Sequence, residues 1–121
     1  MMRNPDAEHI DFGFMEGIVP DNPKWLGCNI DMCCERRGKF LFAEWKRPNE
    51  KIPYGQKILL QALSNNPNCF VIIVNGYSTK AETIINTIYK LNKGQPELVA
   101  KGLKGLQNLI KFFYKNLSLP D

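Results

Sequence analysis

Residues 39–46 alternate between two faces as a β-strand does, because successive side chains of a strand point to opposite sides. One face carries two aromatic rings followed by two charges, Phe40, Phe42, Glu44 and Lys46, and the other carries Leu41, Ala43 and Trp45. Residues 26–35 alternate too, with an apolar face of Cys28, Ile30, Met32 and Cys34 and a second face of Asn29, Asp31 and Cys33. We predict strands over 26–35 and 39–47, joined by a short loop ending in Gly38.

A helix and a buried strand follow. Pro53 suits the first turn of a helix over 53–64, and five positions at helical spacing form its inward stripe: Ile52, Gln56, Leu59, Leu60 and Leu63. The continuous apolar run 69–74, bounded by Asn75-Gly76, indicates a buried strand. One helical crossover between strands implies that this strand runs parallel to 39–46, so the sheet is mixed.

The remaining pattern is helical near the C-terminus. Residues 81–91 fit a helix by spacing and a strand by composition, and we favour the strand. From residue 99 onward an apolar stripe predicts an amphipathic helix: Val99, Leu103, Leu106, Ile110, Phe113 and Leu117. A second face is mostly basic and carries four lysines and one asparagine: Lys101, Lys104, Asn108, Lys111 and Lys115. That face is either merely solvated or a surface that follows nucleic-acid phosphates. The fold class predicted is α/β, one small domain at 26–121 with a mixed central sheet flanked by helices, after an irregular N-terminal arm at 1–25.

Three charged residues of the first two strands converge if those strands pair. Glu44 and Lys46 share a face about 7 Å apart along the strand, and Asp31 can lie beside Glu44. A Glu-x-Lys pair is also common on solvated faces. Here it follows two phenylalanines on its own face, and charges that enter a buried region need partners or a metal. Two carboxylates and a lysine suit a hard divalent cation and a phosphate.

The order of these residues resembles a known superfamily. Asp31, then Glu44-x-Lys46 at the end of an apolar strand, then a helix opening with Gly55-Gln56, is similar to the PD-(D/E)xK nucleases, which include restriction endonucleases, archaeal Holliday-junction resolvases and small phage-encoded nucleases. The resemblance covers about residues 26–75. It implies a restriction-endonuclease-like core in which Asp31 and Glu44 bind metal and Lys46 and Gln56 complete the catalytic set. Ile30 stands where the family often has proline.

The resemblance also implies a further acid near the N-terminus, and the sequence does not select between four candidates: Asp6, Glu8, Asp11 and Glu16. The implied cofactor is Mg²⁺ or Mn²⁺, held by Asp31, Glu44 and the backbone carbonyl of Trp45. The implied activity is metal-dependent hydrolysis of DNA phosphodiester bonds by an endonuclease. The alternative is a catalytically silent module of the same fold that binds nucleic acid or blocks a partner protein.

Composition and charge bear on the compartment and the partners of the protein. The 121 residues are 44% hydrophobic, enough for a core, and the net charge of +4 permits nucleic-acid binding. No apolar run approaches the roughly 20 residues that span a bilayer, and the N-terminus lacks a signal-peptide core, so we expect a cytoplasmic protein without a membrane partner. The four cysteines contain no CxxC, and we expect free thiols instead of a zinc site. The form of the substrate, sequence specificity and a possible homodimer stay open.

Overall fold

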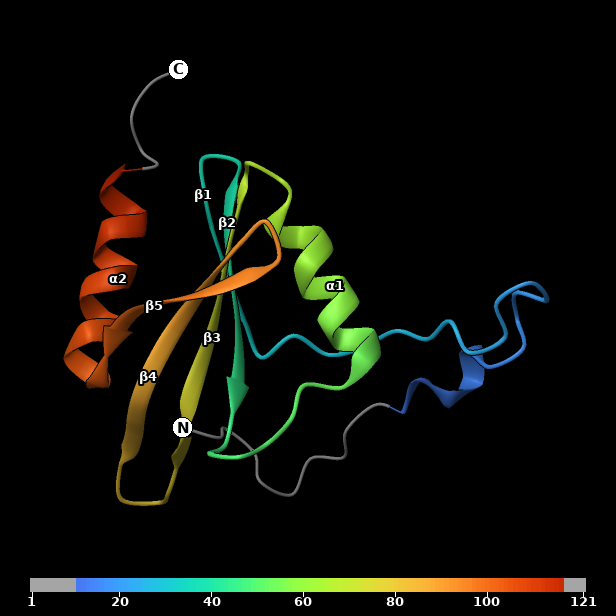
Figure 1. The fold of residues 1–121 in the computed structure, drawn as a ribbon, viewed down its shortest axis with the longest axis horizontal. Helices are drawn as coiled ribbons and strands as arrows, with labels where there is room; N and C mark the ends of the chain where they lie inside the picture. Colours follow the sequence, from blue (N-terminus) through green and yellow to red (C-terminus); the bar gives the residue numbers. More distant parts are fainter. Residues whose placement is uncertain (1–10, 117–121) are drawn as a thin grey trace.

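The computed structural model describes residues 11–116, which form a small α/β domain around one five-stranded mixed sheet. The strands are β1 (Met32–Arg36), β2 (Lys39–Lys46), β3 (Cys69–Ser78), β4 (Thr83–Asn92) and β5 (Gln95–Lys101). The helices are η1 (Phe12–Met15), a short 3-10 helix, and the α-helices α1 (Tyr54–Ser64) and α2 (Gly102–Asn116). Strand order in the sheet equals chain order, and α1 and α2 cover opposite faces of the sheet (Figure 1).

The β2–α1–β3 unit confirms the predicted crossover. β2 and β3 are parallel, with Glu44 opposite Ile73, whereas the pairs β1–β2, β3–β4 and β4–β5 are antiparallel. The last two residues before β2, Arg37 and Gly38, have φ of 52° and 82°. Positive φ at both central residues is what a two-residue turn of type I′ requires, so the predicted short loop ending in Gly38 is a two-residue turn.

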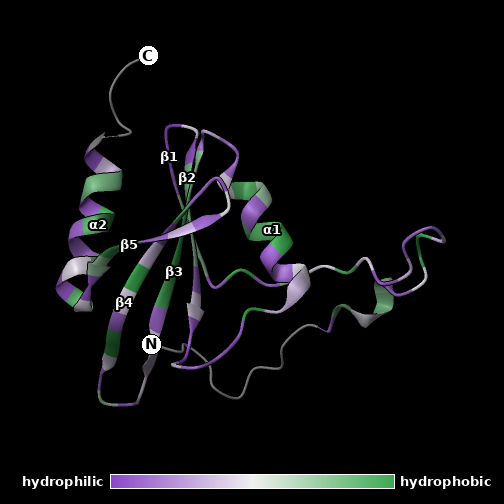
Figure 2. Cartoon of the chain, in the orientation of Figure 1, coloured by the Kyte–Doolittle hydropathy of each residue, from purple (hydrophilic) through white to green (hydrophobic). Residues whose placement is uncertain are grey.

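Two hydrophobic clusters fill the two sides of the sheet. The cluster under α2 centres on fully buried residues of the three middle strands, such as Leu41, Ile72 and Ile88, with Leu106 and Phe113 from the helix. The cluster under α1 contains Leu60, Val71, Ile73 and Leu91. Figure 2 shows hydrophobic colour in the central strands and hydrophilic colour in most of the connecting loops. The stripe predicted for the first helix is buried or half-buried throughout, and that helix is confirmed.

The first predicted strand is shorter than expected. Pairing of β1 with β2 begins at Met32, opposite Ala43, so residues 26–31 lie outside the sheet. The apolar face assigned to this segment was wrong, because Cys28 and Cys34 are exposed. All four cysteines are free thiols, as expected. β1 is an edge strand that covers little of the core, which explains why its alternation does not correspond to burial.

The C-terminal helix also begins later than predicted. Residues 95–101 form the edge strand β5, so Val99 and Lys101 belong to a strand, and the helix starts at Gly102, whose φ is 74°. Leu103, expected on the inward stripe, is 47% exposed. Leu106, Ile110 and Phe113 do pack against the sheet as predicted, and Leu117 lies outside the described residues. The favoured strand at 81–91 is confirmed as β4.

The N-terminal arm is irregular apart from η1 between residue 11 and the start of β1, and Figure 1 shows this segment extending away from the sheet beyond α1. Within residues 11–116, no helix is long and apolar enough to cross a membrane.

Candidate functional site

Glu44 and Lys46 lie at the end of β2, on the face of the sheet that α1 covers. Their side chains are 5% and 7% exposed, and Lys46 Nζ lies 3.4 Å from Glu44 Oε2. The alternation of the strand places both on the face of Phe42, and Ile73 lies opposite Glu44 on β3. A buried ion pair is weak evidence of added stability, because removing two charges from water offsets most of their attraction. This pair therefore invites a functional explanation.

Asp31 lies just before β1 and reaches back to β2. The backbone N–H of Trp45 donates a hydrogen bond of 2.7 Å to Asp31 Oδ2, at the point where the β1–β2 ladder has ended. The carboxylate thus replaces the next strand residue as acceptor. Because the N–H and C=O of a strand residue point to the same edge, the carbonyl of Trp45 also faces Asp31. Asp31 is exposed, so the site opens to solvent on this side.

The electrostatics of the site centre on Glu44. Burial raises the pKa of this carboxyl above its usual range, and the nearby charge of Asp31 raises it further, while Lys46 lowers the pKa only in part. The ammonium of Lys46 therefore offsets only part of the effect that burial and the charge of Asp31 have on Glu44. A cation placed between the two acids would relieve this repulsion.

Two buried oxygens of the site have no hydrogen-bond partner: Glu44 Oε1 and Gln56 Oε1. Gln56 is on the first turn of α1, and its Nε2 donates a hydrogen bond of 3.4 Å to the backbone carbonyl of Asn29, which leaves its oxygen unpaired. A buried polar atom without a partner costs roughly 1–3 kcal/mol, so such atoms call for an explanation such as an ion or water. The structure thus brings together three of the residues predicted from the sequence, Asp31, Glu44 and Lys46. Gln56, the fourth, contacts the backbone two residues before Asp31.

A broad groove of about 1010 Å³ leads to this end of the sheet. It runs between the segment after β2 and the β3–β4 turn, and its lining includes Asp31, Trp45, Arg47 and Lys80. β2 and β3, the only parallel pair of the sheet, both end here, and the carboxyl ends of parallel strands are where open α/β sheets commonly bind ligands. The groove gives an extended ligand access to Asp31.

The donor set fits a hard divalent cation. Two carboxylates, one of them with an unpaired oxygen, and a backbone carbonyl are the oxygen ligands that Mg²⁺ and Mn²⁺ accept. Within residues 11–116, however, no three acidic, histidine or cysteine side chains cluster as a complete metal site. Waters and substrate phosphates commonly complete a Mg²⁺ site that has only one or two carboxylates.

The further acid predicted near the N-terminus is not found among the described candidates. Asp11 accepts a hydrogen bond from the Gly13 backbone N–H and begins η1, and Glu16 forms an exposed ion pair of 2.7 Å with Lys24. Neither joins a cluster with Asp31 and Glu44. The other two candidates, Asp6 and Glu8, lie outside the described residues.

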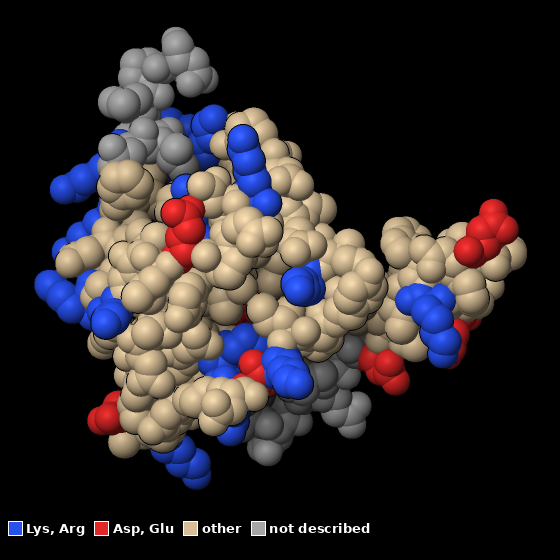
Figure 3. Space-filling model, in the orientation of Figure 1, with Lys and Arg blue, Asp and Glu red and all other residues tan. Residues whose placement is uncertain are grey.

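The basic residues predicted to contact nucleic acid lie apart from these acids. Lys104, Lys111 and Lys115 are exposed on α2, and Lys101 ends the adjoining strand β5. Figure 3 shows Lys and Arg side chains gathered along the α2 side of the molecule. Within residues 11–116, Lys46 is the one basic residue that is buried, whereas the lysines of α2 are exposed to solvent.

Sequence reasoning missed the contribution of Asn29, whose backbone carbonyl orients the amide of Gln56. A main-chain acceptor in an irregular segment leaves no side-chain pattern to recognise. It also missed Lys57, which lies on the same helix as Gln56 and lines a separate cavity.

Comparison with family models, with curated proteins and with solved structures found no match for the chain.

Proposed function

We propose that this protein is a nuclease of the PD-(D/E)xK type, which hydrolyses DNA phosphodiester bonds with Mg²⁺ or Mn²⁺. The observation that carries the proposal is the buried Glu44–Lys46 pair beside Asp31, in which Glu44 Oε1 has no partner. A strand that ends in a buried acid and lysine, followed by a crossover helix with Gln56 in its first turn, also supports a restriction-endonuclease-like core.

Asp31, Glu44 and the carbonyl of Trp45 would hold the cation. When bound, a divalent cation supplies Lewis-acid stabilisation of phosphate charge and a more acidic water. The charge of Asp31 helps to raise the pKa of Glu44, so a cation bound by both carboxylates would lower this repulsion.

Lys46 and Gln56 would act on the substrate. The ammonium of Lys46 lies 3.4 Å from Glu44 Oε2, and both side chains are buried. The ion pair therefore keeps the ammonium oriented without a hydrogen bond from solvent. It would stabilise negative charge that develops on the phosphate, an interaction stronger in the transition state than in the ground state. The unpaired oxygen of Gln56 would accept a hydrogen bond from the attacking water and orient it.

The decisive experiment is cleavage of plasmid and of single-stranded DNA by the purified protein. We expect cleavage with Mg²⁺ or Mn²⁺ and none with EDTA or with Ca²⁺ alone, since calcium fills oxygen sites but is a poorer Lewis acid. The matched controls are Glu44→Gln and Lys46→Met, which keep the size of each side chain. Equal cleavage in EDTA would overturn the metal mechanism. Absence of cleavage of every DNA and RNA form would favour the silent nucleic-acid-binding or protein-blocking module.

A further inference from the structure

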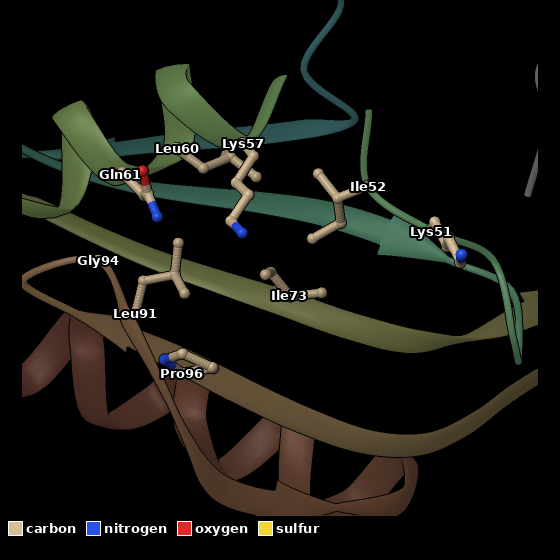
Figure 4. Close-up of a pocket in the computed structure, with 9 residues that line it drawn as sticks. All are labelled: Lys51, Ile52, Lys57, Leu60, Gln61, Ile73, Leu91, Gly94 and Pro96. Carbon is tan, nitrogen blue, oxygen red and sulfur yellow. The ribbon is translucent and has the colours of Figure 1, made fainter. Parts of the chain in front are cut away.

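A second cavity, of about 270 Å³, lies between the inner side of α1 and the sheet (Figure 4). Its apolar walls include Leu60 on α1, Ile73 on β3 and Leu91 on β4. Two of its polar groups come from the helix: Figure 4 shows the side chains of Lys57 and Gln61 extending from α1 toward the sheet. A third, Lys51, comes from the segment before α1. Aliphatic walls with a few convergent polar groups are typical of small-molecule sites, and the volume lies just below the usual range of such sites. The cavity therefore suits one small flat group.

The wall at the far end of α1 is fixed by the β4–β5 turn. The backbone N–H of Gly94 donates a hydrogen bond of 2.8 Å to Ser64 Oγ, which ties this turn to the last residue of the helix. A Cβ at Gly94 would lie 3.3 Å from Gln61 Cγ, so glycine allows the turn to approach the helix closely. The cavity is thus formed before any ligand binds.

The cavity adjoins the candidate metal site. Ile73, in its lining, is the partner of Glu44 in the β2–β3 ladder, and paired residues of neighbouring strands present their side chains on one face. Gln56 and Lys57 are consecutive on α1: Gln56 belongs to the candidate metal site, and Lys57 lines the cavity. A chain of nucleotides that places one phosphate at Glu44 can therefore place a neighbouring group in the cavity.

We propose that this cavity binds one unpaired nucleobase of a single-stranded nucleic acid, with the ammonium groups of Lys51 and Lys57 holding the adjoining phosphates. The inference deepens the proposed nuclease function and rests on it for the position of the scissile bond. The apolar walls offer the two faces that a base needs, and Gln61 offers an amide to its polar edge. A duplex would have to extrude a base at a cost of a few kcal/mol, whereas a single strand has its bases already available. Single-stranded or unpaired segments are thus the favoured substrate class.

Binding is measured in EDTA, by fluorescence anisotropy of labelled dT12, of an abasic dodecamer and of a blunt duplex. We expect dT12 to bind at least fivefold more tightly than the abasic dodecamer, because one enclosed base is worth about 1–3 kcal/mol. Equal affinity for the two single strands would overturn the inference. This comparison uses the unaltered protein, so it does not depend on whether a variant folds.

Two variants locate the effect. Gln61→Trp fills the cavity, and Ala62→Trp, on an exposed position of the same helix, is its control. We expect Gln61→Trp to remove the preference for dT12 over the abasic strand and Ala62→Trp to keep it. Lys57→Gln, at an exposed position, should lower the salt dependence of dT12 binding by about 0.7 of a unit. An unchanged preference in Gln61→Trp would place the base elsewhere and refute the site.

The outcomes also separate this inference from the nuclease proposal. If no nucleic acid is cut but Gln61→Trp abolishes the dT12 preference, the base site stands and the nuclease proposal fails. If plasmid and single strands are cut alike and Gln61→Trp cuts both as the wild type does, the nuclease proposal stands and the base site is refuted.

Discussion

Removing the ammonium of Lys46 and removing the carboxylate of Glu44 are expected to have unequal effects on stability, although the two groups form one ion pair. Lys46→Met keeps the apolar stem and deletes the charge, which leaves a buried Glu44 facing Asp31. Breaking a buried pair from one side costs about 3–5 kcal/mol, and we expect this loss in the free energy of unfolding at pH 8 without metal. Glu44→Gln keeps an amide oxygen for the ammonium of Lys46 and removes the carboxylate that the charge of Asp31 opposes, so we expect a cost below about 1 kcal/mol or a small gain.

The two variants are also expected to differ in how their free energy of unfolding depends on pH. Because the pKa of Glu44 is raised in the folded protein, folding binds a proton between the unfolded and folded pKa values, and the ionised carboxylate opposes folding above them. Wild-type stability from this source therefore falls as pH rises through that window and is regained on acidification. Glu44→Gln lacks this dependence, and Lys46→Met shows it more strongly, because its Glu44 is destabilised further.

The measurement is urea unfolding in EDTA at pH 5 and pH 8 of the wild type, the two single variants and the double variant Glu44→Gln/Lys46→Met, which together form a double-mutant cycle. We expect the double variant to recover most of the loss caused by Lys46→Met, since no buried charge then lacks a partner. Equal costs for the two single variants, or a pH-independent cost of Lys46→Met, would refute the reasoning that one ammonium balances two carboxylates.

Three further predictions follow from the site and the basic face. Asp31→Asn should abolish metal-dependent cleavage yet unfold near the wild-type urea midpoint, because it still accepts the Trp45 hydrogen bond, whereas Asp31→Ala should lose about 1–2 kcal/mol; equal stability would show that the bond contributes nothing. Gln56→Leu should preserve or raise the melting temperature, because it removes an unpaired buried oxygen, while lowering kcat about tenfold; an unchanged kcat would remove Gln56 from the catalytic set. Lys104→Gln with Lys111→Gln should flatten the salt dependence of duplex DNA binding by nearly one unit per lost phosphate contact, with the rate at saturating DNA unchanged; an unaltered slope would mean that this face is only solvated.

The sequence predicts the centre of the fold better than its edges, and the reason is burial. β3 is apolar at consecutive positions because it is covered on both faces, and the inward stripe of α1 is fixed by the side that it packs, so both give strong patterns. β5 is an edge strand whose residues are almost all exposed, with Pro96 near its start, so it carries no alternation to recognise. Val99 lies four residues before Leu103, so it fitted the spacing of the following helix although it belongs to β5.

The same contrast applies to the site. Glu44 and Lys46 were predictable because alternation fixes the face of every residue along a strand once one face is known. Asp31 was predicted beside Glu44 as a residue of the first strand. In the structure it lies just before β1 and accepts a hydrogen bond from the backbone N–H of Trp45. The orientation of the Gln56 amide depends on a main-chain carbonyl of that segment, which no residue type encodes.

The agreement between strand order and chain order has a consequence for how the molecule folds. Every strand pairs with its neighbour in sequence, and the one longer closure, through α1, spans only the segment between Lys46 and Cys69. Chains dominated by such short-range pairings close small loops and fold quickly. Asp31, Glu44, Lys46 and Gln56 all precede β3, so the candidate site can assemble as soon as β3 joins β2, while β4, β5 and α2 are still to be added. The four residues of the candidate site thus leave the ribosome before any residue of β3, β4, β5 or α2.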